Sequence, residues 1–257
     1  MRTKSFAPGR FCWADMAVPD VKRTIGFYTE LLGWNVAPAG KARQGYTILR
    51  KGCEAAVGLY PMAQAQRTRK EKPHWLSYVC TDELERSSAR IADFGGHLEV
   101  GPINVGSAGR SCVLSDPQGA RLALWQPKEF RGAGIWNEPG AICWNELVAM
   151  EAEPSWRFYA RLLAWEANDQ KRSDGDYTLF KLDDQNLAGL RSVGSRFQRL
   201  VNQWVIYFAV SDCDSAVAAA VRMGAATLVP PTSMAEMGRV AIIEDPAGAP
   251  CGLVGQA

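Results

Sequence analysis

The sequence is poor in histidine, in paired cysteines and in net charge, and each shortage argues against a class of protein. Only His74 and His97 supply imidazole in 257 residues, which leaves little for a metal centre. The seven cysteines include no Cys-x-x-Cys pair and lie mostly in apolar runs, so they indicate reduced core thiols. Twenty-nine basic against 27 acidic residues leave a charge of +2, which argues against nucleic-acid binding.

Long apolar runs are also missing. The amino terminus lacks the apolar stretch of a secretion signal, and no segment approaches the length of a membrane span. We therefore expect a cytoplasmic protein that binds neither a membrane nor a nucleic acid. Hydrophobic residues make up 47% of the chain, which is enough for a sizeable core.

The sequence aligns with itself at about half its length, which indicates an internal repeat. A shift of 131 residues places Cys12-Trp13 on Cys143-Trp144, and after a two-residue deletion the shift becomes 129. So many ordered matches of uncommon residues are hard to attribute to chance, and we interpret the chain as two copies of one module. The other matches include Phe27-Tyr28 with Phe158-Tyr159, Trp34 with Trp165, Tyr46-Thr47 with Tyr177-Thr178, Gly58-Leu59 with Gly189-Leu190, Trp75 with Trp204, Tyr78 with Tyr207, Gly109-Arg110 with Gly238-Arg239, and Asp116-Pro117 with Asp245-Pro246.

Local patterns predict the same elements in both copies. Asp20 is placed to cap the first helix, and Asp82 with Glu85 three residues later fits a capping box for the second. The expected elements of the first copy are a strand over 11–18, a helix from Val21 to Leu32, a hairpin of 45–50 with 54–60, a strand over 75–80, a helix closed at Gly95-Gly96, and a hairpin of 110–115 with 120–126.

Two strand-helix-strand-strand-strand units per copy, a Phe-Tyr pair late in the first helix, Leu-Gly-Trp after it and a terminal Asp-Pro-x-Gly turn resemble the vicinal oxygen chelate superfamily. This superfamily contains glyoxalases, bleomycin-resistance proteins and extradiol dioxygenases. The resemblance implies an α+β fold of two tandem modules, each with a curved, mostly antiparallel sheet that forms a cup with helices outside. We expect modules over 8–127 and 141–256, with a linker over 128–140.

The same resemblance places the metal ligands of the superfamily on side chains that cannot coordinate a divalent ion. We therefore expect no metal at either site, and no other cofactor. The positions concerned are Trp13 and Trp144 on the first strands, Leu76 and Val205 on the strands that open the second halves, and Ala123 and Gly252 on the last strands.

Asp15 and Glu146 lie two residues beyond those tryptophans, and residues two apart on a strand share a face. A carboxylate in an apolar strand is costly to bury unless it is paired or protonated. One interpretation is structural, with Arg110, Arg239 or Arg121 as the ionic partner. The other is catalytic, with one or both acids facing a ligand as a general acid or base whose pKa is raised by burial.

Aromatic residues offer two interpretations as well, because they can fill a core or line a ligand site. Aromatic walls favour a flat, largely apolar ligand with one or two polar groups. Arg121 and Trp125 have no counterpart in the second copy, where Pro250 and Val254 stand, so the two cups are expected to differ. The candidate ligand-binding residues are Trp13, Trp144, Tyr46, Tyr78, Tyr177, Tyr207, Arg121 and Trp125.

Two functional hypotheses follow from the sequence. The first is a metal-independent protein that binds a small aromatic or polycyclic compound in a cup, for example to sequester a toxic metabolite. The second is a cofactor-free lyase, isomerase or cyclase that uses Asp15 or Glu146 as general acid or base. A metal-dependent glyoxalase or dioxygenase is disfavoured by the ligand positions. Because two modules can pair within one chain, a monomer or a homodimer is expected.

Overall fold

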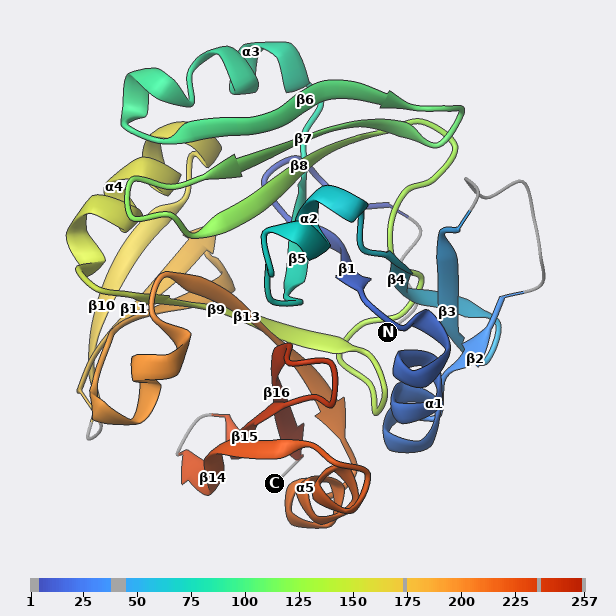
Figure 1. Cartoon of the computed structure of the whole chain (residues 1–257). Helices are drawn as coiled ribbons and strands as arrows, with labels where there is room; N and C mark the ends of the chain where they lie inside the picture. Colours follow the sequence, from blue (N-terminus) through green and yellow to red (C-terminus); the bar gives the residue numbers. More distant parts are fainter. Residues whose placement is uncertain (1–4, 38–44, 173–174, 235–236, 256–257) are drawn as a thin grey trace.

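The computed structural model describes residues 5–37, 45–172, 175–234 and 237–255, which form two eight-stranded sheets (Figure 1). Each sheet contains the strands of one repeat. In spatial order the first sheet consists of β2 (Asn35–Val36), β3 (Thr47–Lys51), β4 (Glu54–Pro61), β1 (Phe11–Val18), β5 (Trp75–Cys80), β8 (Arg121–Pro127), β7 (Gly109–Ser115) and β6 (His97–Val105). The second consists of β10 (Glu166–Arg172), β11 (Gly175–Leu182), β12 (Gln185–Ser192), β9 (Ile142–Ala149), β13 (Gln203–Val210), β16 (Pro250–Gly255), β15 (Gly238–Glu244) and β14 (Ala226–Met234).

Both sheets are mixed and mostly antiparallel, with parallel pairing of β1 with β4 and of β5 with β8, and of β9 with β12 and β13 with β16. The central pair of each sheet is antiparallel. On β1 and β5, Trp13 lies opposite Tyr78 and Asp15 opposite Leu76. The second sheet has the corresponding register on β9 and β13. The predicted α+β fold of two tandem modules is therefore confirmed.

Two of the helices are capped at their N-termini by aspartate side chains, Asp20 and Asp212, whereas the helices that follow Glu83 and Glu151 have no side-chain cap. Asp20 caps α1, since its Oδ1 accepts a hydrogen bond from the Arg23 amide at 3.0 Å. The predicted capping box at Asp82 is wrong, because α3 begins one residue later with Glu83 at the N-cap, and the Glu85 carboxylate pairs with Arg110. The helical segments are α1 (Val21–Leu32), α2 (Gln64–Thr68), α3 (Leu84–Ala89), η1 (Ala92–Phe94), α4 (Ala152–Leu163), η2 (Ser195–Leu200) and α5 (Cys213–Arg222).

The main cores lie between the modules as well as within them. In Figure 1, α1 of the first module lies near α5 of the second, and α3 lies near α4. One apolar cluster joins β1 and α1 to β13, α5 and β16, and a second joins β5, β7 and β8 to α4 and β12. Each half of one module therefore packs against the opposite half of the other, which buries the apolar faces of both sheets.

The motifs that the two repeats share form contacts between the modules. The Tyr28 hydroxyl on α1 donates to Asp245 Oδ2 at 2.8 Å and accepts from Trp75 Nε1 at 3.1 Å. Asp245 opens the Asp-Pro-x-Gly turn of the other module. Tyr159, the repeat mate of Tyr28, is hydrogen-bonded to Asp116 in the turn of the first module and accepts from Trp204 Nε1 of its own module at 2.8 Å. The repeated tyrosine and the Asp-Pro-x-Gly turn therefore serve the packing of the two modules against each other.

Connecting segments are held by the two repeated tryptophans that follow α1 and α4. Trp34 Nε1 donates to the carbonyl of Gly140 at 2.6 Å, and Trp165 Nε1 donates to the carbonyl of Gly9 at 2.7 Å. Both indoles are almost completely buried. Within the described ranges, no helix has the length and apolarity needed to cross a membrane.

Candidate functional site

The first cup is the face of the first sheet turned away from α1, and it is lined by Trp13, Asp15, Tyr46, Tyr60 and Tyr78. Strand parity produces this face, because Ala14, Met16 and Val18 pack into the core with α1 while Trp13 and Asp15 face the other way. Trp13 packs in a separate aromatic cluster that includes Trp125. The candidate ligand residues Trp13, Tyr46 and Tyr78 therefore lie on one side of the first sheet.

Asp15 is the polar centre of the first cup. Its Oδ2 accepts hydrogen bonds from the hydroxyls of Tyr46 at 2.9 Å and Tyr78 at 3.0 Å. Its Oδ1 is buried and has no hydrogen-bond partner, although the residue is only 4% exposed. Burial raises the pKa of Asp15 from 3.8 to about 7, and the two tyrosine hydroxyls limit the rise. This carboxyl group can therefore exchange a proton near neutral pH.

A chain of donors leads to Asp15. Trp13 Nε1 donates to the Tyr46 hydroxyl at 2.9 Å, and that hydroxyl in turn donates to Asp15. Burial raises the pKa of Tyr46 and of Tyr78 well above the usual tyrosine value, so both remain protonated donors. Gly58, which lies opposite Asp15 on β4, makes this possible, because a Cβ at this position would overlap the Tyr46 hydroxyl.

The second cup has a corresponding carboxylate with a different partner. Glu146 is 1% exposed, and its Oε2 accepts from the Tyr207 hydroxyl at 2.7 Å. Its Oε1 lies 3.1 Å from Nε of Arg191, which is 4% exposed. Trp144 Nε1 donates to the Tyr177 hydroxyl at 3.2 Å, as its mate does in the first cup. The second cup thus contains a buried ion pair.

Arg191 is a difference between the two cups that the sequence pattern did not predict. Under the shift of 131, Arg191 stands where the first copy has Tyr60, and both residues pair with equivalent positions of the central strand. The signal was present in the sequence as an arginine within the apolar stretch of β12, two residues beyond Gly189. Strand pairing then brings it beside Glu146, which lies opposite Gly189.

The proposed partners Arg110 and Arg239 were wrong. Arg110 forms an ion pair with Glu85, and Arg239 forms one with Asp214 at 2.6 Å. Both acids lie early in the helix that precedes the arginine's strand, and they hold the guanidinium groups at the surface. Arg121 does not pair with Asp15 either.

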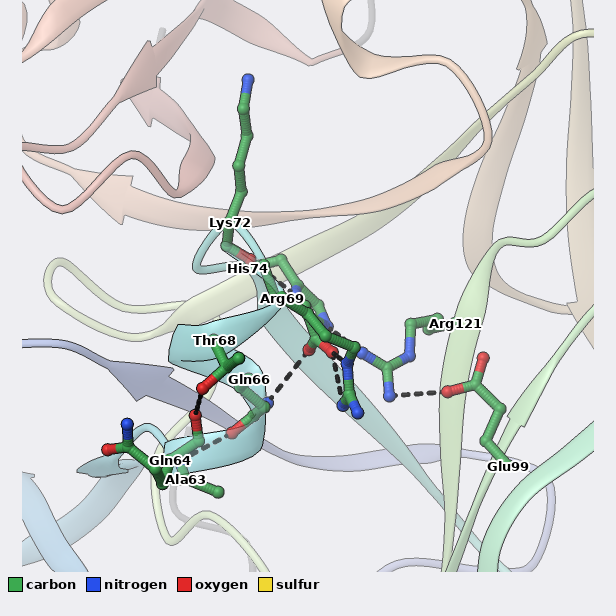
Figure 2. A network of polar contacts seen from close by, with 10 residues as sticks. Ala63, Gln64, Gln66, Thr68, Arg69, Lys72, His74, Glu99 and Arg121 are labelled. Atoms are coloured by element: carbon green, nitrogen blue, oxygen red, sulfur yellow. Dashed lines mark hydrogen bonds and ion pairs between the residues drawn. The ribbon is translucent and has the colours of Figure 1, made fainter.

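Arg121 and Trp125 lie at the border of the first cup. Arg121 Nη2 lies 2.6 Å from Glu99 Oε2, and its Nη1 lies 3.3 Å from Nε2 of the half-buried His74 (Figure 2). Trp125 Nε1 donates to the carbonyl of Phe130 at 3.0 Å, and the Phe130 ring packs edge-on against Trp13 with centroids 4.8 Å apart. A residue of the connecting segment therefore covers part of the cup.

The two cups differ in exposure as well as in charge. Tyr46, Tyr60 and Tyr78 are all half-buried, whereas Tyr177 and Tyr207 in the second cup are buried. The tyrosines of the first cup are therefore more exposed than those of the second, whereas Trp13 is more buried than its counterpart Trp144.

The residues of the cups do not fit the metal ion of the superfamily. Trp13, Leu76 and Ala123 offer no oxygen, thiolate or imidazole ligand, and Asp15 is a single carboxylate among phenols. Throughout the described part of the chain, no group of three or more His, Cys, Asp or Glu side chains is arranged to hold a metal.

Comparisons with known proteins agree with the fold. The family model described as Glyoxalase/Bleomycin resistance protein/Dioxygenase superfamily matches residues 10–124, and the model described as Glyoxalase-like domain matches residues 142–254. The chain belongs to this superfamily, also called the vicinal oxygen chelate superfamily, and carries two of its modules in tandem.

Related sequences cover nearly the whole chain. The anthracycline biosynthesis protein DnrV of Streptomyces peucetius is 29% identical over 255 residues, which are 95% of this chain and 92% of DnrV. CFP32 of Mycobacterium tuberculosis, provisionally named a glyoxylase, is 28% identical over 242 residues, 92% of this chain and 91% of CFP32.

Solved structures with low sequence identity share the fold. The 2,2',3-trihydroxybiphenyl 1,2-dioxygenase of Sphingomonas wittichii superposes with a TM-score of 0.67 at 11% identity, covering 97% of this chain and 91% of the dioxygenase. The Mn(II)-bound glyoxalase of Novosphingobium aromaticivorans gives 0.65 at 10% identity, covering 96% and 82%. At these identities the likeness establishes the fold alone.

Proposed function

We propose that this protein binds a small, flat aromatic or polycyclic organic molecule in the first cup, without a metal ion, and that Asp15 is its polar anchor. The observation that carries the proposal is the buried Asp15 Oδ1, which has no partner while the rest of the carboxyl group is fully hydrogen-bonded. A buried acceptor without a partner is costly, so a ligand that donates to it gains affinity.

The walls of the first cup support an aromatic ligand. Trp13, Tyr46, Tyr60 and Tyr78 surround Asp15, and the Tyr46 and Tyr60 rings stack with centroids 5.7 Å apart. Aromatic rings bury a large apolar area and favour stacked or edge-on partners. The names of DnrV and DauV assign those relatives to anthracycline biosynthesis, which concerns polycyclic aromatic compounds. A polycyclic ligand is therefore the class that we propose for this chain.

The second cup is proposed to be structural. Its carboxylate, Glu146, is already paired with Arg191, and the surrounding tyrosines are buried. Replacement of either charged partner would leave a buried charge unpaired. We therefore assign the ligand to the first cup.

The binding proposal can be tested with matched variants of the two cups. A thermal-shift screen of aromatic metabolites, followed by calorimetry on the hits, identifies ligands. Tyr78→Phe should weaken binding, because Asp15 Oδ2 then loses one of its two hydrogen bonds. Tyr207→Phe, the same change in the second cup, should leave affinity unchanged after correction for stability. Equal effects of the two substitutions, or no ligand that responds to Tyr78→Phe, would reject the assignment of the ligand to the first cup.

A second candidate function is cofactor-free catalysis at the same site. It is favoured by the pKa of Asp15, which at about 7 suits a general acid or base at neutral pH. The reaction class would be a lyase, isomerase or cyclase reaction in which Asp15 moves a proton on the bound ligand. Product analysis of each hit separates the two functions, because binding without conversion supports sequestration, and conversion that is lost in Asp15→Asn supports catalysis.

A further inference from the structure

The internal repeat allows the two cups to be compared position by position. In the second cup, Glu146 and the rings of Tyr177 and Phe197 surround a cation, the guanidinium group of Arg191. The central carbon of that group lies 5.2 Å from the Tyr177 ring centroid and 4.4 Å from the Phe197 centroid. A carboxylate at 3.1 Å and two aromatic faces are a favourable setting for a buried cation.

The first cup keeps the carboxylate and an aromatic counterpart of Tyr177, but neither shift of the repeat places an aromatic residue at the position of Phe197, and among the described residues no lysine or arginine is paired with its carboxylate. Asp15 takes the place of Glu146, and Tyr46 takes the place of Tyr177. Tyr60 stands where Arg191 would be, and it stacks on Tyr46 at an interplanar angle of 17°. Asp15 Oδ1 is unpartnered.

The positive charge of Arg121, close to Tyr60, is already paired with an acid. Arg121 interacts electrostatically with Tyr60, which in turn interacts with Asp15. Its guanidinium group is paired with Glu99 and contacts His74 (Figure 2). Arg121 therefore does not play the part for Asp15 that Arg191 plays for Glu146.

We propose that the ligand of the first cup is an aromatic cation, whose ammonium or guanidinium-like group lies beside Asp15 as the Arg191 guanidinium lies beside Glu146. This inference rests on the proposed function, because it assumes that an aromatic ligand binds in the first cup. It adds the chemical class of the ligand, which the aromatic walls alone do not give.

Proton release provides a signature of this pairing. Without a ligand, burial keeps the Asp15 carboxyl group mostly protonated at pH 6, since its pKa is about 7. The groups that interact with it are the phenols of Tyr46, Tyr78 and Tyr60, which stay neutral. A cation favours the carboxylate and should therefore displace a proton into the buffer at pH 6, but not at pH 8.5.

The test uses three naphthalene probes of matched shape on the full chain. They are 1-naphthylmethylamine, which is a cation, 1-naphthalenemethanol, which is neutral, and 1-naphthoate, which is an anion. At pH 8 we expect the amine to bind at least roughly tenfold more tightly than the alcohol, and the naphthoate to bind most weakly. Asp15→Asn should remove the advantage of the amine while the alcohol still binds.

Buffers of different ionisation enthalpy then test the contact itself. At pH 6 the calorimetric enthalpy of amine binding should vary with the buffer as expected for release of close to one proton, and this dependence should vanish in Asp15→Asn. An enthalpy independent of the buffer at pH 6 would overturn the pairing of the cation with Asp15.

A self-occupied variant gives a separate test. Tyr60→Arg introduces into the first cup the side chain that fills the second, so it should raise the melting temperature and abolish amine binding, whereas Tyr60→Phe should retain it. A Tyr60→Arg variant that folds and binds the amine as tightly as the parent protein would overturn the inference.

The outcomes separate this inference from the function on which it rests. If the alcohol binds as tightly as the amine, and Tyr78→Phe weakens both, the ligand need not be a cation and the proposed function stands. If none of the three probes binds, or binding ignores Tyr78→Phe, the assignment of an aromatic ligand to the first cup fails, and the cation inference fails with it.

Discussion

Asp15→Asn is expected to stabilise the protein, by an amount that depends on pH. In the folded protein, burial raises the pKa of Asp15 from its ordinary value of 3.8 to about 7. Below pH 3.8 the carboxyl group is protonated in both states and contributes nothing to the pH dependence. Between pH 3.8 and 7 it ionises in the unfolded chain but resists ionisation in the folded one, so stability falls as pH rises through this window.

The magnitude follows from the difference between the two pKa values. Each pKa unit corresponds to about 1.36 kcal/mol, so the ionised carboxylate costs the folded protein about 4 kcal/mol above pH 7. Asparagine keeps the shape of the side chain and cannot ionise. The free energy of unfolding of Asp15→Asn, minus that of the parent, should therefore increase by about 4 kcal/mol between pH 4 and pH 8.

Urea denaturation at several pH values, followed by tryptophan fluorescence, measures this difference. The value at one pH includes changes in hydrogen bonding, so the slope with pH is the informative quantity. If the stability curves of the parent and Asp15→Asn run parallel from pH 4 to pH 8, the raised pKa of Asp15 is refuted, and with it the case for proton transfer at this residue.

Three further substitutions probe the second cup, the module interface and the packing beside Asp15. Glu146→Gln leaves the buried Arg191 without its ionic partner and should cost roughly 3–5 kcal/mol in urea denaturation; a cost under about 1 kcal/mol would show that the ion pair does not stabilise the cup. Tyr28→Phe removes the hydroxyl that links the modules, and differential scanning calorimetry should register a loss of roughly 1–3 kcal/mol. Gly58→Ala crowds the tyrosine hydroxyl bonded to Asp15, so calorimetry should find weakened binding of any first-cup ligand, and unaltered affinity would contradict the packing.

The fold could be predicted because its signals are local or repeated. The apolar run over 11–18 is β1 with the same bounds, since every residue of this strand is buried. The Asp20 cap needs only a carboxylate three residues before a free amide. The internal repeat supported the remaining elements, because each local pattern occurs in both copies.

The ionic partners could not be predicted, because they depend on register between strands and on the positions of helices. Strand parity predicted that Asp15 and Glu146 lie on the same face of their strands as Trp13 and Trp144. It did not indicate that β12 pairs in parallel with β9, which brings Arg191 beside Glu146. Strand parity also could not show that Arg110 forms an ion pair with Glu85, an acid on a neighbouring helix.

The repeat also indicates how structural and functional residues can be told apart within one chain. Residues that both copies share, such as Tyr28 with Tyr159, contact the Asp-Pro-x-Gly turn of the other module, so they hold the two modules together and would be needed whatever the protein binds. Residues that differ at equivalent positions make the two cups different. The main example is Tyr60 in the first copy, which is replaced by the charged Arg191 beside the buried Glu146 in the second. Because the second copy stabilises its carboxylate with its own cation, the same physical need in the first copy must be met by a proton or by a ligand. Asp15 is protonated below pH 7 in the free protein, so the ligand that replaces this proton determines what the first cup recognises.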